Sequence, residues 1–436
     1  MNKNIKIFLV GFLSSILLQA QQLKPISQSE VVGRAIKDNQ NLKISRQDFN
    51  LAKADYRQTN AVFLPNISMT YTGISTTNPL MAFGSKLNQS ILTQNDFNPN
   101  LLNNPSTTQN YATRFEIQQP LINLDGIHKR KAAKNKMGAM VLQTKRTTDY
   151  LEFEVQKAYM ELQLAYKAVN VLNKTLNATK SNKKLANDKF KQGYLQRSDV
   201  LLVEVRTIEV ENQLQTARSH VKNASNYISF LINDSEDVIY KPTDSLTILS
   251  INSKNNIQVS KNRADIKAME LASNAFKNLS KADKLTFLPT LNAFGSYELY
   301  DNDIFKGDAN GYIIGAQLNW TLFEGYKRFG KTQKSKAEYE KSKIQYKQYV
   351  TQSQLELKKA KRALLDAENK LKLTSLALQQ SEEALRIRID RFKEGLEKTS
   401  DLLLAETQYS QKELEYYQTI YEYNYAQVYL DFLTKE

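Results

Sequence analysis

The sequence predicts a mostly α-helical membrane protein in which one structural unit occurs twice. Two stretches, Phe190–Leu202 and Phe392–Leu404, keep Phe, Gly, Ser and Asp in the same order 202 residues apart. Apolar and polar residues alternate in two pairs of short segments, which is typical of β-strands. Two much longer segments carry apolar residues at a mean spacing near 3.5, which is typical of coiled-coil helices. Together these observations predict a mixed α/β chain of two repeats.

The N-terminus resembles a secretory leader. Lys3 and Lys6 precede an apolar run over 7–18, and the small residue Ala20 follows it. This order predicts a signal peptide over residues 1–20, because the apolar run is too short for an ordinary membrane helix. No later run of about 20 apolar residues indicates a transmembrane helix. We therefore expect a first repeat over 21–235, a connector over 236–261 with little regular structure, and a second repeat over 262–436.

Composition argues against several functional classes. Lys and Arg number 60 against 45 Asp and Glu, a formal charge of +15, but they are spread along the chain and indicate solvated helix faces rather than nucleic-acid binding. Cysteine is absent and the two histidines, His128 and His220, lie far apart in the sequence. No catalytic grouping, metal-ligand spacing or phosphate loop is visible, so we expect neither an enzyme nor a cofactor or metal site.

Each repeat is predicted to begin with a helix and continue into a β-hairpin. The helical patterns cover about 27–60 and 262–283, and each ends at Phe-Leu-Pro, at 63–65 and 287–289. The hairpins are expected within 64–122 and 288–323. Strands of about ten residues are long enough to cross a bilayer when tilted. The strand pattern alone does not exclude a soluble antiparallel sheet.

The connections between the paired strands differ in length. The second, near 301–310, is short and polar. The first spans about 76–110 and is rich in Asn, Pro, Thr and Ser, with several apolar side chains. Because so long a connection is usually functional or mobile, we expect an external loop that folds partly over a pore mouth.

Long helices follow each hairpin and then reverse. The first pair is predicted over 127–190 and 198–232, and the second over 326–392 and 400–434. At 1.5 Å per residue the long members reach about 95–100 Å. Their seam positions are often Ala, Ser or Thr, which allows close approach of helices. In the first return helix the predicted seam begins with Val200, Val203, Thr207 and Val210. In the last helix it runs through Leu402, Ala405, Tyr409, Lys412 and Tyr416.

The duplicated stretches read as tight reversals between helices. Gly193 and Gly395 can adopt the left-handed conformation that ends a helix. A serine five residues later, Ser198 or Ser400, can cap the next helix. The adjacent acid, Asp199 or Asp401, then faces the positive end of the helix dipole.

Four strands from one chain cannot close a barrel with an interior, and lipid does not tolerate open sheet edges. Either the sheet is soluble or several copies share one barrel. Small barrels begin near eight strands. Two or more protomers are then required, and three would supply a dozen strands.

At this level of detail the chain resembles the TolC-like family of outer-membrane efflux proteins. The likeness rests on the duplicated Phe-Leu-Pro, on Pro-Leu-Ile at 120–122 and Thr-Leu-Phe at 321–323, and on Gly-x5-Asp at each reversal. The resemblance implies a homotrimer with a shared twelve-stranded antiparallel β-barrel in outer-membrane lipid. It also implies that the barrel continues as a long coiled-coil α-helical barrel through the periplasm.

The resemblance further implies that the reversals are the periplasmic tips. Aspartates after the second reversal ring the tunnel entrance in the family, and that position falls on Asp401, with Asp199 as its counterpart. Both could equally be helix caps. A second family aspartate falls on Leu404, and an arginine of some relatives falls on Glu397, so the family's latch does not transfer completely. The residues expected to contact an adaptor are Gly193, Tyr194, Leu195, Gly395 and Leu396.

The expected function is a passive exit duct of a tripartite efflux or type I secretion system. It would be coupled to an inner-membrane pump of the RND or ABC type through a periplasmic adaptor protein. The alternative is a periplasmic coiled-coil scaffold or adaptor without a pore. The sequence leaves open whether small molecules or proteins are exported.

Overall fold

The computed structural model describes residues 22–250 and 258–436. The predicted signal peptide, 1–20, lies outside these residues. The chain forms two compact units, each built from several stretches of the sequence. The first unit holds the described residues up to 43 together with those of 147–259 and 354–435. The second holds 44–146, 260–353 and residue 436.

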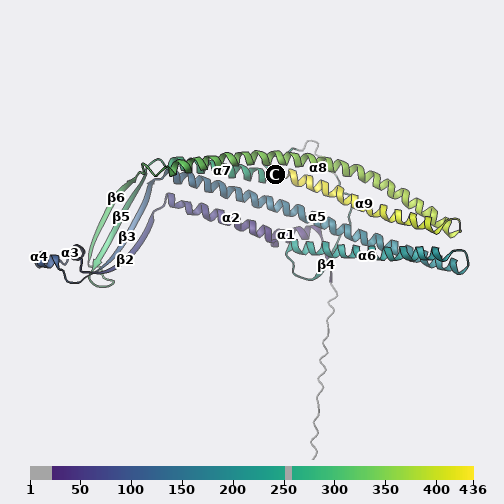
Figure 1. Ribbon diagram of the computed structural model, residues 1–436, viewed down its shortest axis with the longest axis horizontal. Helices are drawn as coiled ribbons and strands as arrows, with labels where there is room; N and C mark the ends of the chain where they lie inside the picture. Colours follow the sequence, from purple (N-terminus) through teal and green to yellow (C-terminus); the bar gives the residue numbers. More distant parts are fainter. Residues whose placement is uncertain (1–21, 251–257) are drawn as a thin grey trace, which may run out of the picture. The chain divides into compact units, whose positions relative to one another are not determined.

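The second unit contains a four-stranded antiparallel sheet in the order β2-β3-β5-β6 (Figure 1). Its strands are β2 (Asn66–Thr76), β3 (Thr108–Ile122), β5 (Thr290–Asp301) and β6 (Ala309–Asn319). The two hairpins join through β3 and β5, which leaves β2 and β6 as the edges. Each strand has at least 11 residues, enough to cross a bilayer when tilted.

One face of this sheet is apolar and uncovered by the rest of the described chain. The register aligns Ile67, Ile117, Gly295 and Ile314 in one row across all four strands. The side chain of Ile314 is 79% exposed. The next row on the same face consists of Met69, Phe115, Tyr297 and Tyr312, which are also exposed. An exposed apolar patch of this kind marks a surface that contacts another protein or a membrane.

The opposite face of the sheet is polar. Arg114 and Glu298 are direct cross-strand partners, and Arg114 Nε lies 2.6 Å from Glu298 Oε1. The Tyr300 hydroxyl donates a hydrogen bond to the other oxygen of Glu298. The alternation predicted from the sequence therefore separates an apolar from a charged surface.

The long connection 76–110, which carries no predicted element, contains α3 (Pro79–Asn88), the 3-10 helix η2 (Gln94–Phe97) and α4 (Pro99–Asn103). Lys86 binds Asp96 at 2.7 Å within it. The Gln89 amide donates to the backbone oxygens of Gln109 and Asp301, at 2.8 and 3.1 Å. These bonds fasten the end of α3 to the ends of β3 and β5.

The predicted helix over 27–60 is two helices, α1 (Gln28–Asp38) and α2 (Gln40–Gln58). The chain breaks at Asn39, whose backbone is extended with φ −60° and ψ 130°. The Asn39 side chain accepts from Leu42 N at 3.1 Å and donates to Leu231 O at 2.9 Å. Asparagine competes for backbone hydrogen bonds in this way, and the periodicity of apolar residues does not reveal it. A 3-10 turn, η1 (Thr59–Val62), follows α2.

Four further helices complete the framework: α5 (Leu124–Lys191), α6 (Arg197–Ile232), α8 (Lys327–Lys393) and α9 (Thr399–Thr434). The second unit also contains α7 (Ala264–Leu285). Among the described helices, none combines the length and apolar content needed to cross a membrane.

In the first unit, α1 and a small parallel sheet pack on α5 and α6. The sheet pairs β1 (Gln22–Ile26) with β4 (Val238–Pro242). The connector expected to have little regular structure therefore contains a strand. Its partner lies more than 200 residues away, and local patterning cannot reveal such a pairing. The packed side chains include Ile26, Val31, Leu42, Val155, Tyr159, Leu162, Ile228 and Tyr240.

The predicted heptad seam is confirmed in α6, where positions such as Val200, Val203 and Val210 are buried. In α9 it is partly wrong. Beyond Ala405, the buried side chains of this part of α9 are Glu406, Ser410 and Glu413, rather than Tyr409 and Lys412. The sequence pattern assumed an apolar seam, but this part of the interface is polar.

Candidate functional site at the hairpin turns

The two reversals, which join α5 to α6 and α8 to α9 (Figure 1), have the same backbone geometry. Gly193 and Gly395 adopt φ of +82° and +76°, as predicted. In the first turn Tyr194 N donates to Lys189 O at 2.9 Å, and in the second Leu396 N donates to Arg391 O at 2.9 Å. These bonds span six residues and end each long helix in a Schellman-type turn.

The predicted serine caps are wrong. The N-cap residues are Gln196 for α6 and Lys398 for α9, so Ser198 and Ser400 lie inside the first turn of each helix. Each helix begins one residue earlier than expected, at Arg197 and Thr399. In α6, Asp199 Oδ2 accepts the Gln196 N–H at 3.1 Å.

The two candidate gate residues are therefore not equivalent. Asp199 makes a capping bond to the backbone, which accounts for its position structurally. Asp401 instead has the Ser400 hydroxyl at 3.4 Å, a long and weak contact. Both side chains are half-buried in the single chain. Asp401 is thus the aspartate of the pair whose position capping explains less well.

Glu397, where some relatives carry arginine, closes the second turn. Its two carboxylate oxygens accept from Arg388 Nη1 at 2.6 Å and from Arg391 Nε at 2.9 Å. Its side chain is only 10% exposed. The end of α8 is thereby held to the turn within the same hairpin. Leu404, where a family aspartate is absent, is exposed.

Lys189 joins the two hairpins. From the last turn of α5, its ammonium donates to Phe392 O at 2.6 Å and lies 3.3 Å from Lys393 O. It also lies 4.8 Å from the centre of the Phe392 ring. A cation placed on the last carbonyls of α8 matches the negative end of the helix dipole.

Whereas Lys189 contacts the end of α8, two other residues of α5 contact α9. They precede Lys189 in α5 at intervals of seven residues. Asn182 Nδ2 donates to Glu406 Oε2 at 3.0 Å. The hydroxyl oxygens of Thr175 and Ser410 lie 3.2 Å apart. We call the three contacts made by Thr175, Asn182 and Lys189 the polar seam. Sequence periodicity missed its α9 side because it searched for apolar residues.

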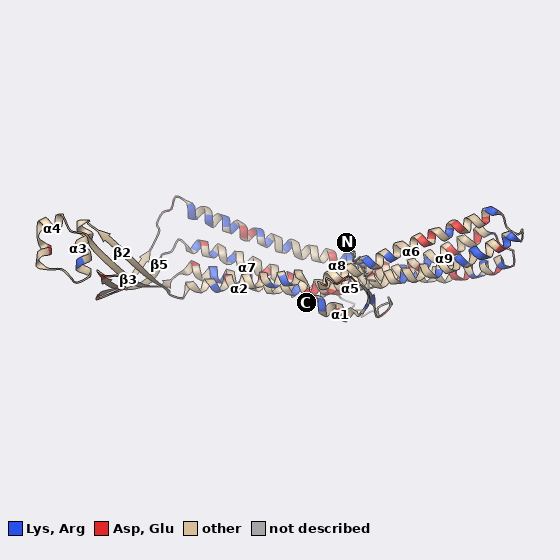
Figure 2. Cartoon of the chain, turned by 90° about the horizontal axis from the view of Figure 1, so that it is seen from below, with Lys and Arg blue, Asp and Glu red and all other residues tan. Residues whose placement is uncertain are grey.

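The tip side chains expected to meet an adaptor point largely into solvent. Tyr194 is 76% and Leu396 is 67% exposed, whereas Leu195 is half-buried. Lys and Arg stand close to both turns (Figure 2). These cations include Lys191, Arg197, Lys393 and Lys398.

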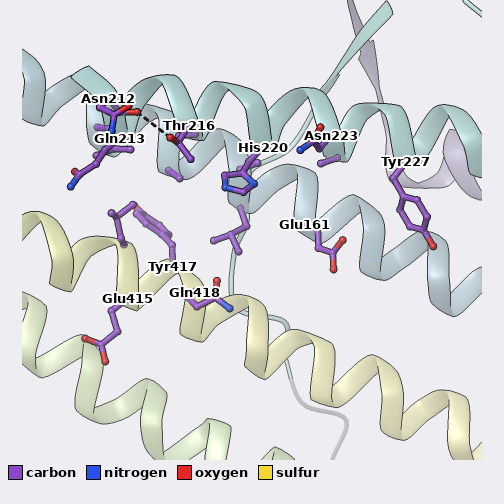
Figure 3. Close-up of a pocket in the computed structure, with 17 residues that line it drawn as sticks. Glu161, Asn212, Gln213, Thr216, His220, Asn223, Tyr227, Glu415, Tyr417 and Gln418 are labelled. Carbon is purple, nitrogen blue, oxygen red and sulfur yellow. Dashed lines mark hydrogen bonds between the residues drawn. The ribbon is translucent and has the colours of Figure 1, made fainter. Parts of the chain in front are cut away.

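A groove of about 820 Å³ lies between α5, α6 and α9 in the first unit (Figure 3). Its floor is apolar and includes Leu164, Ala168 and Leu172, while Glu161 and His220 stand among its polar lining residues. Glu161 accepts a hydrogen bond from Tyr421 at 2.8 Å. Nothing in the described part of the chain shows what covers this groove.

Similar folds are found among solved structures of outer-membrane channels. CmeC of Campylobacter jejuni is 17% identical with a TM-score of 0.81, covering 93% of this chain and 85% of its own. CusC is 15% identical with a TM-score of 0.81, covering 94% and 92%. The open state of MtrE from Neisseria gonorrhoeae is 17% identical with a TM-score of 0.76, covering 93% and 88%. These likenesses establish the fold. No curated protein matches the chain by sequence.

The sequence also matches the profile of the outer membrane efflux protein family over 31–234 and 258–434. The chain belongs to this family, and the resemblance to TolC-like proteins is confirmed. It is an outer-membrane protein whose structural neighbours are channels rather than enzymes.

Proposed function

We propose that the protein is a passive exit duct formed by three copies of the chain. The sheet carries the main support. It has two edges, β2 and β6, that no other strand of the described chain covers, and one face that is apolar. Lipid requires closed edges. Three such sheets joined edge to edge would give twelve strands, with the polar face around Arg114 and Glu298 lining the pore.

The helical pairs α5–α6 and α8–α9 would continue this barrel as a periplasmic tunnel. In this arrangement the two repeats, 21–235 and 262–436, contribute alternate walls. The turns at Gly193 and Gly395 would form the inner mouth. Asp199 and Asp401 would then be repeated around one axis and disfavour anions there.

Coupling to a pump would occur at the same turns. The exposed Tyr194 and Leu396, with Gly193, Leu195 and Gly395, offer a small apolar surface surrounded by cations. We propose that a periplasmic adaptor binds there and links the duct to an inner-membrane pump of the RND or ABC type. The chain itself would contribute no chemistry, and export energy would come from the pump.

Deletion of the gene tests the duct as a whole. We expect higher sensitivity to toxic small molecules, or loss of a secreted protein, and restoration by the intact gene. Unchanged drug and secretion profiles under conditions that induce the pump would overturn the proposal.

Replacing both aspartates tests the proposed entrance. In planar bilayers, Asp199→Ala with Asp401→Ala should weaken block of the channel by multivalent cations, because the negative ring is lost. The Asp401→Ala change alone should give part of the effect, because it removes one of the two proposed rings of aspartates. Asp390→Ala, an exposed acid one turn before the second reversal, is the matched control. Equal block in all variants would leave the aspartates with a structural role only.

A further inference from the structure

A buried carboxyl group lies in the middle of the polar seam. Glu406 is 3% exposed, and one of its two oxygens accepts the Asn182 bond. The other oxygen, Oε1, is buried and has no hydrogen-bond partner among the described residues. A buried carboxylate with an unpaired oxygen is costly, whereas the neutral acid is much less so.

The charges around Glu406 only partly offset this cost. From α6, Arg206 favours the ionised form, but its own buried Nε also lacks a partner in the described chain, and its Nη1 is 3.4 Å from Glu209. From α5 the contacting group is the neutral amide of Asn182. The neighbouring Lys183 is 3.5 Å from Glu204.

The other acids nearby do not stabilise the ionised form of Glu406. Further along α9, Glu413 is buried as well, and its pKa is raised chiefly by burial. Glu382 of α8 raises the pKa of Glu413 further, while Lys174 and Lys167 of α5 lower it. Burial also dominates at Glu406 and raises its pKa from 4.5 to about 6, against the opposing effects of Asn182 and Arg206.

The equivalent position in the first repeat does not carry a buried, partly unpaired carboxyl group. Glu204 stands 202 residues before Glu406, in the equivalent place after the first turn. Its side chain is 31% exposed and pairs with Lys183. Only the second copy places this acid between the two hairpins.

We propose that Glu406, Asn182 and Arg206 form a proton-dependent latch that holds the α8–α9 hairpin against α5. The neutral acid keeps the polar seam joined. Ionisation leaves a buried charge that is relieved when α9 moves away and water reaches the carboxylate. The proposed function supplies only the consequence, which is that separation of the hairpins widens the inner mouth of the duct.

The direction of the pH dependence follows from linkage. The joined seam binds the proton of Glu406 more tightly than the separated seam does. Its stabilising effect is complete below the ordinary pKa of 4.5 and is lost as the pH rises through about 6. The difference between these values corresponds to a rise of about 30-fold in the ratio of separated to joined hairpins over the whole titration, of which about eightfold falls between pH 5 and pH 8.

Alkylation of one introduced cysteine measures this ratio directly. The chain contains no cysteine, and Ser410 is buried in the seam at 3% exposure. In the purified full-length protein, Ser410→Cys should react with a maleimide only when the hairpins separate. We compare its rate with and without Glu406→Gln at each pH, so that the reactivity of the thiol itself cancels.

The quotient of the two rates, without and with Glu406→Gln, should rise about eightfold from pH 5 to pH 8. The rise comes from ionisation of Glu406, which the amide cannot undergo. Glu204→Gln changes the half-buried counterpart in the first repeat and should leave the pH dependence unchanged. A quotient that stays constant from pH 5 to pH 8 would overturn the latch.

The exposed position Ser400→Cys provides a reference that does not need Glu406→Gln. With Glu406 intact, the rate at position 410 divided by that at 400 should rise with pH, and a flat quotient would contradict the proposal. Because neither measurement requires conduction, failure of the latch is distinguishable from failure of the duct.

Discussion

At the scale of single residues, contacts made by charged side chains hold the hairpin turns. Lys189 binds the last carbonyls of α8, and Glu397 gathers Arg388 and Arg391 around the second turn. Both sets of contacts are charge-assisted bonds, which are stronger than neutral ones. Family resemblance marked position 397 only as a departure, yet the glutamate has a clear structural role.

Lys189→Met should loosen the contact between the hairpins. Loss of a charge-assisted bond to the end of a helix costs about 1–2 kcal/mol. We expect cleavage by chymotrypsin at Tyr194 and Leu396 to become about tenfold faster. Lys191→Met, which removes an exposed lysine two residues later, is the control. Identical cleavage rates in the two variants would show that the Lys189 bond contributes little.

At the scale of elements, the duplicated glycine was the most reliable signal in the sequence. Both copies take positive φ, and no neighbouring atom lies within 4 Å of the place that a Cβ would occupy, so backbone conformation alone requires glycine. The serines at 198 and 400 were less informative. Serine, aspartate and the chain itself compete to cap a helix, and local sequence does not decide between them.

Gly395→Ala should destabilise the second turn by about 1 kcal/mol, because alanine is strained at this φ. Hydrogen exchange at the Leu396 amide, which is bonded to Arg391 O, should become several-fold faster. Gly33→Ala lies in the interior of α1 with equally open surroundings, and there alanine should be neutral or stabilising. Unchanged protection of the Leu396 amide in Gly395→Ala would contradict the requirement for positive φ.

At the scale of the whole molecule, the alternation of side chains in the sheet determines which face can contact the membrane. Ile313 and Ile314 are adjacent and both exposed, but they lie on opposite faces of β6. Ile314 belongs to the apolar face and Ile313 shares its row with Ser296 and Glu116 of the polar face. Comparing the same substitution at these two positions therefore distinguishes the effect of lipid contact from the effect of losing an exposed apolar side chain.

Ile314→Arg should lower the amount of protein inserted in the outer membrane, because a cation on the lipid face near the bilayer centre costs about 2–4 kcal/mol. Ile313→Arg should be tolerated, since water would reach that face. The amount of heat-stable protein recovered in the outer-membrane fraction measures the insertion of each variant. Equal loss in the two variants would mean that the sheet does not present its apolar face to lipid.

The sequence by itself determined the class of the protein. Period-two segments, heptads and the duplicated Gly-x5-Asp led to the strands, the long helices and the reversals, because each depends on residues close together in the chain. The family followed from their order. These features also supplied the candidate aspartates, although not the difference between Asp199 and Asp401.

Only the tertiary structure decided which polar groups meet. The pairing of β1 with β4, the contact of Lys189 with Phe392 O, and the burial of Glu406 against Asn182 all join residues about 200 positions apart. Periodicity assigned Tyr409 and Lys412 to the last seam because it continues a fixed spacing of three and four residues from Leu402 and Ala405. The seam that folding produced is polar, since close approach of α5 and α9 there is satisfied by hydrogen bonds rather than by apolar packing.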